Sequence, residues 1–360
     1  MAVSVVFKDI IIDSHKGEYS VSFNSKSLQG LANNSGTESF YIIDKNVADL
    51  YSSDLESILE SEMFLLIDAS EDNKSLDKFP YYVDRLVSKG IKRGHTLVAI
   101  GGGITQDITC FLASTLMRGL DWIFYPTTLL AQSDSCIGSK SSINSGKIKN
   151  ILGTFTPPQK VILDINFLET LNKQDIFSGI GEMIKVHAID SPESFDEISK
   201  NYNNLITNST SMKSFIYNSL LIKKRIIELD EFDKGPRNVM NYGHSFGHAI
   251  ESATNYSIPH GIAVTIGMDM ANFIAMKLKL TGEENFYRMH GVLEKNSSTY
   301  RSYPIEAEAL INALSKDKKN TATQLRLIMP NEDSKISIGL YDNSSEFRSY
   351  AQEYLNLFQR

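Results

Sequence analysis

The sequence has few cysteines, no excess of positive charge and no long apolar run. Cys110 and Cys136 are the two cysteines, and both stand in apolar or small-residue surroundings, which indicates a reducing compartment without a disulfide framework. The net charge of -7 argues against a nucleic-acid or anionic-membrane surface. No stretch of about eighteen apolar residues occurs, so we expect no membrane span. Residues 1–12 lack the basic region and cleavage site of a secretory leader, and we expect a cytoplasmic globular protein.

The chain also lacks internal repeats and low-complexity linkers, and its 360 residues are enough for about two domains. Helical spacing of apolar residues from about position 175 onward replaces an earlier alternation of strands and helices. We therefore predict an α/β domain over residues 1–172 and an all-α domain over residues 173–360. The expected strands are residues 3–7, 19–23, 41–43, 63–67, 96–100, 122–125 and 161–163, and the expected helices include 79–89, 104–117, 211–230 and 263–279.

A glycine triplet follows the strand expected at residues 96–100 and precedes a helix. Strand, glycines and helix together can cradle a phosphate, because the missing side chains let backbone N–H groups approach a pyrophosphate at the helix N-terminus. Gly101, Gly102 and Gly103 do not have the Gly-x-Gly-x-x-Gly spacing, so a tight structural turn remains an alternative. Asp107 is an unusual residue for an apolar helix and suggests a polar role.

Three of the seven histidines lie close together in the second half of the chain. His244 and His248 are four residues apart and share one helix face, so both can converge on one point, or one can bind a metal while the other moves a proton. Closely packed core histidines are the structural alternative. His260 nearby, together with polar residues around it, favours a metal site; these are Arg237, Asn241, Glu182 and Lys185. We expect His15, His95 and His290 at the surface, and His187 behind Glu182 or in the core.

Sequence blocks along nearly the whole chain resemble the 3-dehydroquinate synthase family of sugar phosphate cyclases. The blocks are Gly101-Gly-Gly-x-x-x-Asp107, Met117-Arg-Gly119, Pro126-Thr-Thr-Leu-Leu130, Asp134-Ser-x-Ile-Gly-x-Lys140, Lys149-Asn150, Gly181-Glu-Met-Ile-Lys185, Arg237-Asn-x-x-Asn-x-Gly-His-Ser-x-Gly-His-Ala-Ile-Glu251 and His260-Gly261. Their spacing is family-like, and jointly they are specific. The resemblance implies a Rossmann-like α/β domain that binds NAD and a helical domain that binds a divalent metal, usually zinc, with cobalt as an alternative.

The resemblance also assigns roles to individual residues. It implies Glu182, His244 and His260 as metal ligands, a set with open positions for substrate oxygens that suits catalytic rather than structural zinc. The implied NAD contacts are Asp44, Asn46, Glu71, Lys74, Gly101, Gly102, Gly103, Asp107, Thr127, Thr128, Lys149, Phe167 and Thr170. The implied substrate residues are Asp134, Lys140, Asn150, Lys185, Lys223, Arg237, Asn241, His248 and one of Lys318 and Lys319, with Arg118 supplied by the partner subunit of a homodimer.

The reaction implied by the resemblance is redox-neutral and starts from 3-deoxy-D-arabino-heptulosonate 7-phosphate. The C5 hydroxyl is oxidised by NAD⁺, phosphate leaves by β-elimination, the hydride returns, and an intramolecular aldol closes the carbocycle to give 3-dehydroquinate. Lys140 and His248 are expected to handle the phosphate and relay protons, and Arg237 with Lys223 to bind the carboxylate.

Three departures from the family pattern leave other functions open. The usual Gly-Gly-Lys-Thr is Gly138-Ser-Lys-Ser141, the usual Leu-Gly-Lys-Asn is Lys147-Ile-Lys-Asn150, and the usual Leu-Pro is Leu171-Asn172. They suit a paralogue acting on another sugar phosphate, such as a 2-epi-5-epi-valiolone or 2-deoxy-scyllo-inosose synthase. The retained Arg237 argues for a substrate with a carboxylate, since a buried arginine without an anion is unfavourable. A metal-dependent polyol or glycerol phosphate dehydrogenase and a non-enzymatic binding protein are the further alternatives.

Overall fold

The structure is a computed structural model that describes residues 7–29, 31, 39–146, 148–316, 320–321 and 323–359. The chain folds into two compact units. Unit 1 contains Met1–Leu171 and Lys223–Phe232, and unit 2 contains Asn172–Ile222 and Asp233–Arg360. The predicted domain division at residue 172 did not foresee that Lys223–Phe232 would pack with the first unit, and the division itself stays a prediction.

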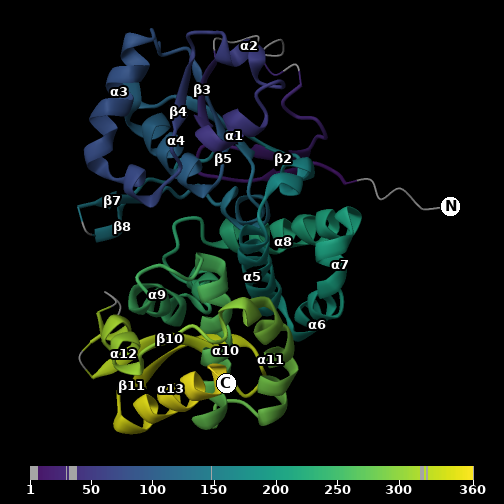
Figure 1. Cartoon of the computed structure of the whole chain (residues 1–360), viewed down its shortest axis with the longest axis vertical. Helices are drawn as coiled ribbons and strands as arrows, with labels where there is room; N and C mark the ends of the chain where they lie inside the picture. The colour runs from purple at the N-terminus through teal and green to yellow at the C-terminus, as the bar shows by residue number, and fades with distance from the viewer. Residues whose placement is uncertain are drawn as a thin grey trace, which may run out of the picture. The chain divides into compact units, whose positions relative to one another are not determined.

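Unit 1 is built on a mostly parallel sheet (Figure 1). Within the described residues its strand order is β1-β2-β9-β6-β5-β3-β4, and only the β1–β2 pair is antiparallel. The strands are β1 (Ile10–Ile12), β2 (Tyr19–Phe23), β3 (Ser39–Asp44), β4 (Phe64–Ile67), β5 (Thr96–Gly101), β6 (Asp121–Pro126) and β9 (Lys160–Leu163). A separate antiparallel hairpin consists of β7 (Ile143–Ser145) and β8 (Ile148–Leu152).

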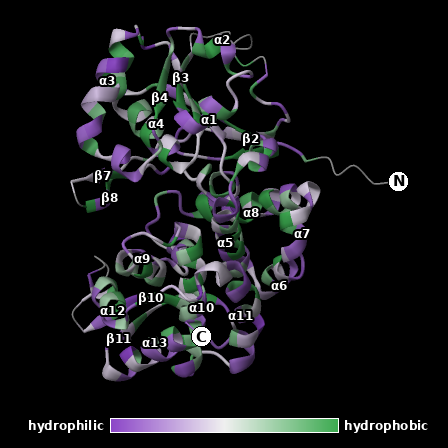
Figure 2. Cartoon of the chain, viewed as in Figure 1, coloured by the Kyte–Doolittle hydropathy of each residue, from purple (hydrophilic) through white to green (hydrophobic). Residues whose placement is uncertain are grey.

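Helices cover the sheet because its central strands are apolar on both faces. Strand β5 is buried along its whole length, as expected for a parallel strand inside an α/β fold. Strand β3, which pairs with β5, and the edge strand β4 are coloured as hydrophobic in Figure 2, whereas α3 carries much hydrophilic colour. The helices of unit 1 are α1 (Lys45–Leu50), α2 (Glu56–Leu59), α3 (Phe79–Ser88) and α4 (Gly103–Thr115), and α4 packs on β5 and β6.

Unit 2 is organised around a buried helix, α10 (His260–Lys277). Its residues from Gly261 to Ala275 are all buried, so it is apolar on every side, as a central helix must be. Helices α5 (Lys173–Asp190), α9 (His244–Ala253), α11 (Glu283–Ser297) and α13 (Ser345–Phe358) pack against it. The other elements are α6 (Pro192–Lys200), α7 (Tyr202–Thr207), α12 (Ala307–Ser315), β10 (Gln324–Pro330) and β11 (Ile336–Asp342). Helix α8 (Ser209–Leu229) belongs to unit 2 up to Ile222 and to unit 1 from Lys223 onward.

The predicted fold class, an α/β first part and a helical second part, is confirmed. The expected strands at 19–23, 41–43, 63–67, 96–100, 122–125 and 161–163 correspond to β2, β3, β4, β5, β6 and β9. The strand expected at residues 3–7 lies, apart from Phe7, outside the described residues. The β10–β11 hairpin was not anticipated in the helical part. Among the described residues, no helix combines the length and apolarity needed to cross a membrane.

Candidate active site

The residues assigned to NAD gather at the carboxyl edge of the sheet in unit 1. Asp44 ends β3, Gly101 ends β5, and Thr127 directly follows β6. In a parallel sheet these ends lie side by side, which is where α/β folds bind their ligands. The Asp44 side chain accepts a hydrogen bond from Asn46 N at 2.9 Å and caps α1, and burial raises the pKa of its carboxyl group. Gly102 caps α4 and Gly103 begins it.

Lys74 is the centre of a polar cluster in the same unit. Its buried ammonium donates to Asp107 Oδ2 at 3.1 Å and to Asn150 Oδ1 at 3.0 Å, and lies 3.6 Å from Glu71 Oε1. Burial raises the pKa of Asp107 to about 6, although Lys74 and the Ser142 amide oppose this shift. Asn150, assigned from the resemblance to the substrate, is therefore brought together with residues assigned to the cofactor.

The remaining cofactor residues occupy different environments. Phe167 belongs to the apolar core and packs edge-on against Tyr51, with ring centroids 5.2 Å apart. Thr170 Oγ1 lies 3.1 Å from Tyr51 Oη, so it borders the same aromatic pair. Thr128 Oγ1 accepts from the Ala131 amide at 3.3 Å, and Lys149 lies on the exposed strand β8.

Two substrate-assigned side chains pair with each other in unit 1. The Lys223 ammonium forms an ion pair with the Asp134 carboxylate and also donates to the Asp134 carbonyl oxygen at 2.6 Å. Both residues are buried. Lys140 is exposed next to buried Gly138 and Ser139. Arg118 is exposed at the turn before β6, so it lies at the amino edge of the sheet, whereas Asp44 and Gly101 lie at the carboxyl ends of their strands. Lys318 and Lys319 lie outside the described residues.

Unit 2 brings the three assigned metal ligands together. Glu182 lies on α5, His244 begins α9 and His260 begins α10. Glu182 Oε1 is 3.4 Å from His260 Nε2 and 3.7 Å from His244 Nε2. His248 also contributes, because one ring nitrogen from each of His244, His248 and His260 lies within 4.8 Å of the others. The three imidazoles thus form one group, and the Glu182 carboxylate lies beside two of them, His244 and His260.

The surroundings of the imidazoles determine which nitrogen can bind an ion. His244 Nδ1 lies 3.3 Å from the Tyr242 carbonyl oxygen, and His260 Nδ1 lies 3.3 Å from Glu251 Oε1. Both partners accept, so each Nδ1 carries a proton, and Nε2, which faces Glu182, is the nitrogen that an ion would bind. Glu251 was not singled out from the sequence, although its position seven residues after His244 puts it on the same face of α9.

Burial and charge tune this cluster strongly. Burial would raise the pKa of Glu182, but Lys185, at 2.5 Å from Oε2, and the imidazoles hold it well below its usual range. Burial lowers the pKa of His244, which keeps its imidazole neutral. Burial would also lower the pKa of His260, but the Glu182 and Glu251 carboxylates raise it, so a metal ion must compete with a proton there. Glu182 Oε1 is buried and accepts no well-formed hydrogen bond from the described residues.

Close helix contacts explain why these ligands meet. A Cβ on Gly181 would lie 2.3 Å from the Gly261 carbonyl oxygen, and a Cβ on Gly261 would lie 1.9 Å from the Ser178 carbonyl oxygen. Only glycine permits α5 and α10 to touch here. Because Gly181 precedes Glu182 and Gly261 follows His260, this contact brings the carboxylate to the imidazole.

Two further residues assigned to the substrate, and three histidines outside the cluster, have the following surroundings. Arg237 is buried and Asn241 donates to the Asn238 carbonyl oxygen at 3.1 Å, both in a 3₁₀ turn over Pro236–Asn241. The predicted surface location of His95 is wrong, since it is 4% exposed. His290 is half-buried against Asp269, with Nδ1 2.9 Å from Oδ2. His187 is buried beside Ser194.

Comparisons with known proteins identify the family of this chain. Residues 64–178 match the family described as 3-dehydroquinate synthase N-terminal, and residues 179–320 match 3-dehydroquinate synthase C-terminal. A 3-dehydroquinate synthase from Alkaliphilus oremlandii is 35% identical over 306 residues, which cover 84% of each protein.

Solved structures of other cyclases share the fold. A 2-deoxy-scyllo-inosose synthase, in complex with carbaglucose-6-phosphate, NAD⁺ and Co²⁺, has a TM-score of 0.84 at 22% identity and covers 96% of this chain and 100% of its own. A 2-epi-5-epi-valiolone synthase from Streptomyces hygroscopicus, with NAD⁺ and Zn²⁺ bound, has a TM-score of 0.81 at 23% identity and covers 99% of both chains.

Proposed function

The chain belongs to the 3-dehydroquinate synthase family, and on that premise we propose that it converts 3-deoxy-D-arabino-heptulosonate 7-phosphate into 3-dehydroquinate and phosphate. This is a carbon–oxygen lyase reaction of the shikimate pathway, with NAD and a divalent metal, zinc or cobalt, as cofactors. The convergence of Glu182, His244 and His260 carries the proposal.

The residues of unit 2 fit a catalytic metal. One carboxylate and two imidazole Nε2 atoms are the donor types that zinc prefers. The buried Glu182 Oε1 accepts no well-formed hydrogen bond from the described residues, and a bound ion would satisfy this oxygen instead. When bound, the metal supplies a Lewis acid that acidifies a substrate hydroxyl, and NAD supplies a reversible hydride acceptor. Lys185 balances the charge of Glu182 at 2.5 Å and keeps it ionised.

The other side chains bind and orient the substrate in this proposal. Lys140 and His248 take the phosphate and move protons, and Arg237 binds the carboxylate. Lys223 is paired with Asp134, so it acts on the substrate together with that carboxylate. Unit 1 supplies the NAD contacts at the carboxyl edge of its sheet, where Lys74 and Asp107 supply paired charges.

Substrate identity rests on the degree of similarity. The chain is 35% identical to a 3-dehydroquinate synthase but 22% and 23% identical to the two specialised cyclases. That difference favours the carboxylate-bearing substrate, in line with the retained Arg237. A related cyclase acting on sedoheptulose 7-phosphate or glucose 6-phosphate is the second candidate, motivated by the Gly138-Ser-Lys-Ser141 departure.

The test is to incubate the purified protein with zinc, NAD⁺ and 3-deoxy-D-arabino-heptulosonate 7-phosphate, and to follow phosphate, NADH and the product by NMR. We expect phosphate release, 3-dehydroquinate and no net NADH. Arg237→Ala should abolish most of this activity, whereas Arg348→Ala, an exposed arginine of the same unit, should retain it. Turnover of sedoheptulose 7-phosphate instead would identify a specialised cyclase, and NADH accumulation with a simple polyol would disprove the cyclase function.

We further propose a cytoplasmic homodimer whose partner subunit supplies Arg118. The exposed position of Arg118 at the amino edge of the sheet supports a role outside its own subunit, and the free, buried Cys110 and Cys136 suit a reducing compartment. Mixing Arg118→Ala with His244→Ala subunits tests the first point. Recovery of part of the activity from two inactive variants supports the shared site, and no recovery in a proven mixed dimer contradicts it.

A further inference from the structure

The loop that presents Lys140 is held by side chains from distant parts of unit 1. On one side, the Gly138 amide donates to Tyr19 Oη at 3.1 Å. On the other, Ser139 Oγ donates to Glu231 Oε1 at 2.8 Å. The backbone of Lys140 forms a β-bridge with Phe155. These contacts leave the backbone at Lys140 with little freedom.

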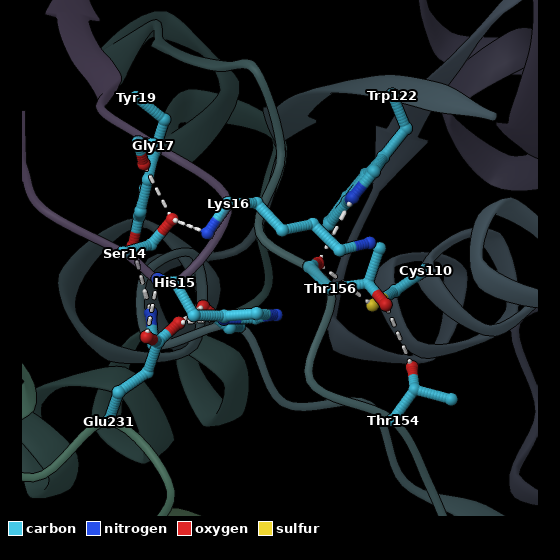
Figure 3. A network of polar contacts seen from close by, with 12 residues as sticks. Ser14, His15, Lys16, Gly17, Tyr19, Cys110, Trp122, Thr154, Thr156 and Glu231 are labelled. Atoms are coloured by element: carbon cyan, nitrogen blue, oxygen red, sulfur yellow. Dashed lines mark hydrogen bonds and ion pairs between the residues drawn. The ribbon is translucent and has the colours of Figure 1, made fainter. Parts of the chain in front are cut away.

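Glu231 is itself fixed by the turn between β1 and β2. Its Oε2 accepts from the His15 backbone N–H at 2.8 Å, and its Oε1 lies 2.9 Å from His15 Nδ1 (Figure 3). The Glu231 side chain is 13% exposed. Burial would raise its pKa, but the hydrogen bonds from His15 and Ser139 lower it, so the carboxylate is charged at neutral pH. Ser139 therefore bonds to an anion that cannot easily turn away.

The backbone explains why Ser139 needs this partner. Its φ is 67° and that of Gly138 is 110°, both in the left-handed region. A serine is strained there relative to glycine, and a charge-assisted hydrogen bond offsets such strain. Position 139 is also one where the sequence departs from the Gly-Gly-Lys-Thr of the family. In this chain the departure has a matching acceptor in Glu231.

The same short segment supports the neighbouring substrate residue. Lys223 and Glu231 lie at opposite ends of Lys223–Phe232, the stretch that packs with unit 1. Lys223 holds Asp134, and Glu231 holds Ser139, five residues further on. The stretch Lys223–Phe232, which begins in α8 and continues past its end, thus holds both flanks of the segment that runs from Asp134 to Lys140.

We propose that Glu231 is a positioning residue for the reaction: fixed by His15, it holds through Ser139 the loop conformation that places the Lys140 ammonium for an anionic group of the substrate. The expected effect of Glu231 on the enzyme kinetics rests on the proposed function, whereas its effect on the loop conformation does not. Glu231 itself is not required to touch the substrate.

Hydrogen exchange and kinetics test this proposal with four variants. Ser139→Ala removes the contact, and Glu231→Gln weakens it, because one amide oxygen and an NH2 group replace the two carboxylate oxygens that face Ser139 and His15. Their double variant should lose nothing more, and Glu228→Gln is the control. Glu228 lies in the last turn of α8, shortly before Glu231, and accepts from the Asp13 amide at 2.9 Å, but the bond of Ser139 is to Glu231. We expect backbone amides of residues 137–142 to exchange about tenfold faster in the first three variants and unchanged in the control.

Enzyme assays on the same variants separate positioning from stability. KM for the sugar phosphate should rise about tenfold in each single variant and no further in the double variant, because one shared contact is lost. The dissociation constant of NAD⁺ should stay constant. Ser139→Gly removes both the backbone strain and the hydroxyl that bonds to Glu231. The thermal midpoint of this variant should therefore match that of the wild type, while its KM still rises.

Several outcomes would overturn the proposal. Unchanged exchange in Glu231→Gln and Ser139→Ala contradicts it, and so do additive effects in the double variant. An equal effect of Glu228→Gln would mean that docking of the helix end matters, not the Ser139 contact. If the wild type does not turn over the sugar phosphate, the proposed function fails, and the exchange comparison still decides whether Glu231 orders the loop.

Discussion

Glu251 is placed to influence the metal that we propose for unit 2 without touching it. Its carboxylate lies 3.3 Å from His260 Nδ1 and fixes the tautomer that directs Nε2 toward Glu182. Partners of this kind also raise the basicity of the imidazole they hold. The side chain is 13% exposed, so water competes little for the contact.

Glu251→Gln should therefore weaken zinc binding about 10- to 100-fold without removing a ligand. The amide keeps the size of the side chain but loses the charge that orients His260. Competition with a chromophoric chelator gives the affinity directly, with Glu294→Gln on α11 as a control that leaves it unchanged. An affinity within about twofold of the wild type would show that His260 needs no such partner.

Asp107 links protonation to stability in unit 1. Its pKa in the folded protein is raised from 3.8 to about 6, chiefly by burial. The stabilisation from this group is therefore fully present below pH 3.8 and is lost as the pH rises through about 6. Asp107→Asn removes this pH dependence. The free energy of unfolding of the variant, relative to that of the wild type, should therefore rise by up to about 3 kcal/mol as the pH increases from 4 to 8. Urea unfolding at several pH values measures this difference, and parallel curves would contradict it.

For single residues, the sequence indicated which side chains belong to the candidate site better than it indicated which side chains contact one another. The family blocks brought attention to Glu182, His244 and His260, and the structure places them around one point. The contact of Asn150 with Lys74 and the burial of His95 were not predictable, because each depends on residues distant in the sequence. The position of Glu251 beside the histidines could have been predicted from the sequence, since positions 244, 248 and 251 share one helix face.

At the element scale, the glycine contact between α5 and α10 aligns the ligands of unit 2. Gly261→Ala would place a Cβ 1.9 Å from the Ser178 carbonyl oxygen, so the two helices must separate. We expect a loss of about 1–3 kcal/mol in the free energy of unfolding, together with weaker zinc binding as Glu182 moves away from His260. Chemical denaturation and a zinc titration measure the two effects.

Gly291→Ala is the matched control for this prediction. Gly291 lies inside α11, and a Cβ there would meet nothing within 4 Å. Alanine is the better helix former, so this variant should gain about 0.5–1 kcal/mol and bind zinc normally. Equal zinc affinity in both alanine variants would show that the α5–α10 distance does not govern the site.

Elements with a strong local pattern were predicted well, and the others were not. Residues 79–89 and 96–100 have clear periodicity or a continuous apolar run, and they form α3 and β5. The β10–β11 hairpin was missed because β11 is exposed or half-buried along its length, which leaves little apolar signal. Its register comes from pairing with β10, of which helical spacing of apolar residues carries no sign.

At the scale of the whole molecule, the assigned functions divide between the units. The residues assigned to NAD lie in unit 1, and the assigned metal ligands lie in unit 2. The sequence predicted two parts from the change in periodicity near residue 172. It did not place Lys223–Phe232 in unit 1, because that placement depends on long-range contacts such as Glu231 with His15 and Lys223 with Asp134.

This division predicts that metal and NAD⁺ stabilise the protein independently. Removing the metal with a chelator should lower the thermal midpoint, and zinc at about 100 times its dissociation constant should restore about 2.7 kcal/mol by mass action. His244→Ala should lose the response to zinc, since a ligand to the ion is gone, yet keep the response to NAD⁺. Differential scanning calorimetry with each ligand alone and with both measures these responses. Equal stabilisation of His244→Ala and the wild type by zinc would place the metal elsewhere, and loss of the NAD⁺ response in that variant would show that the cofactor depends on the metal site.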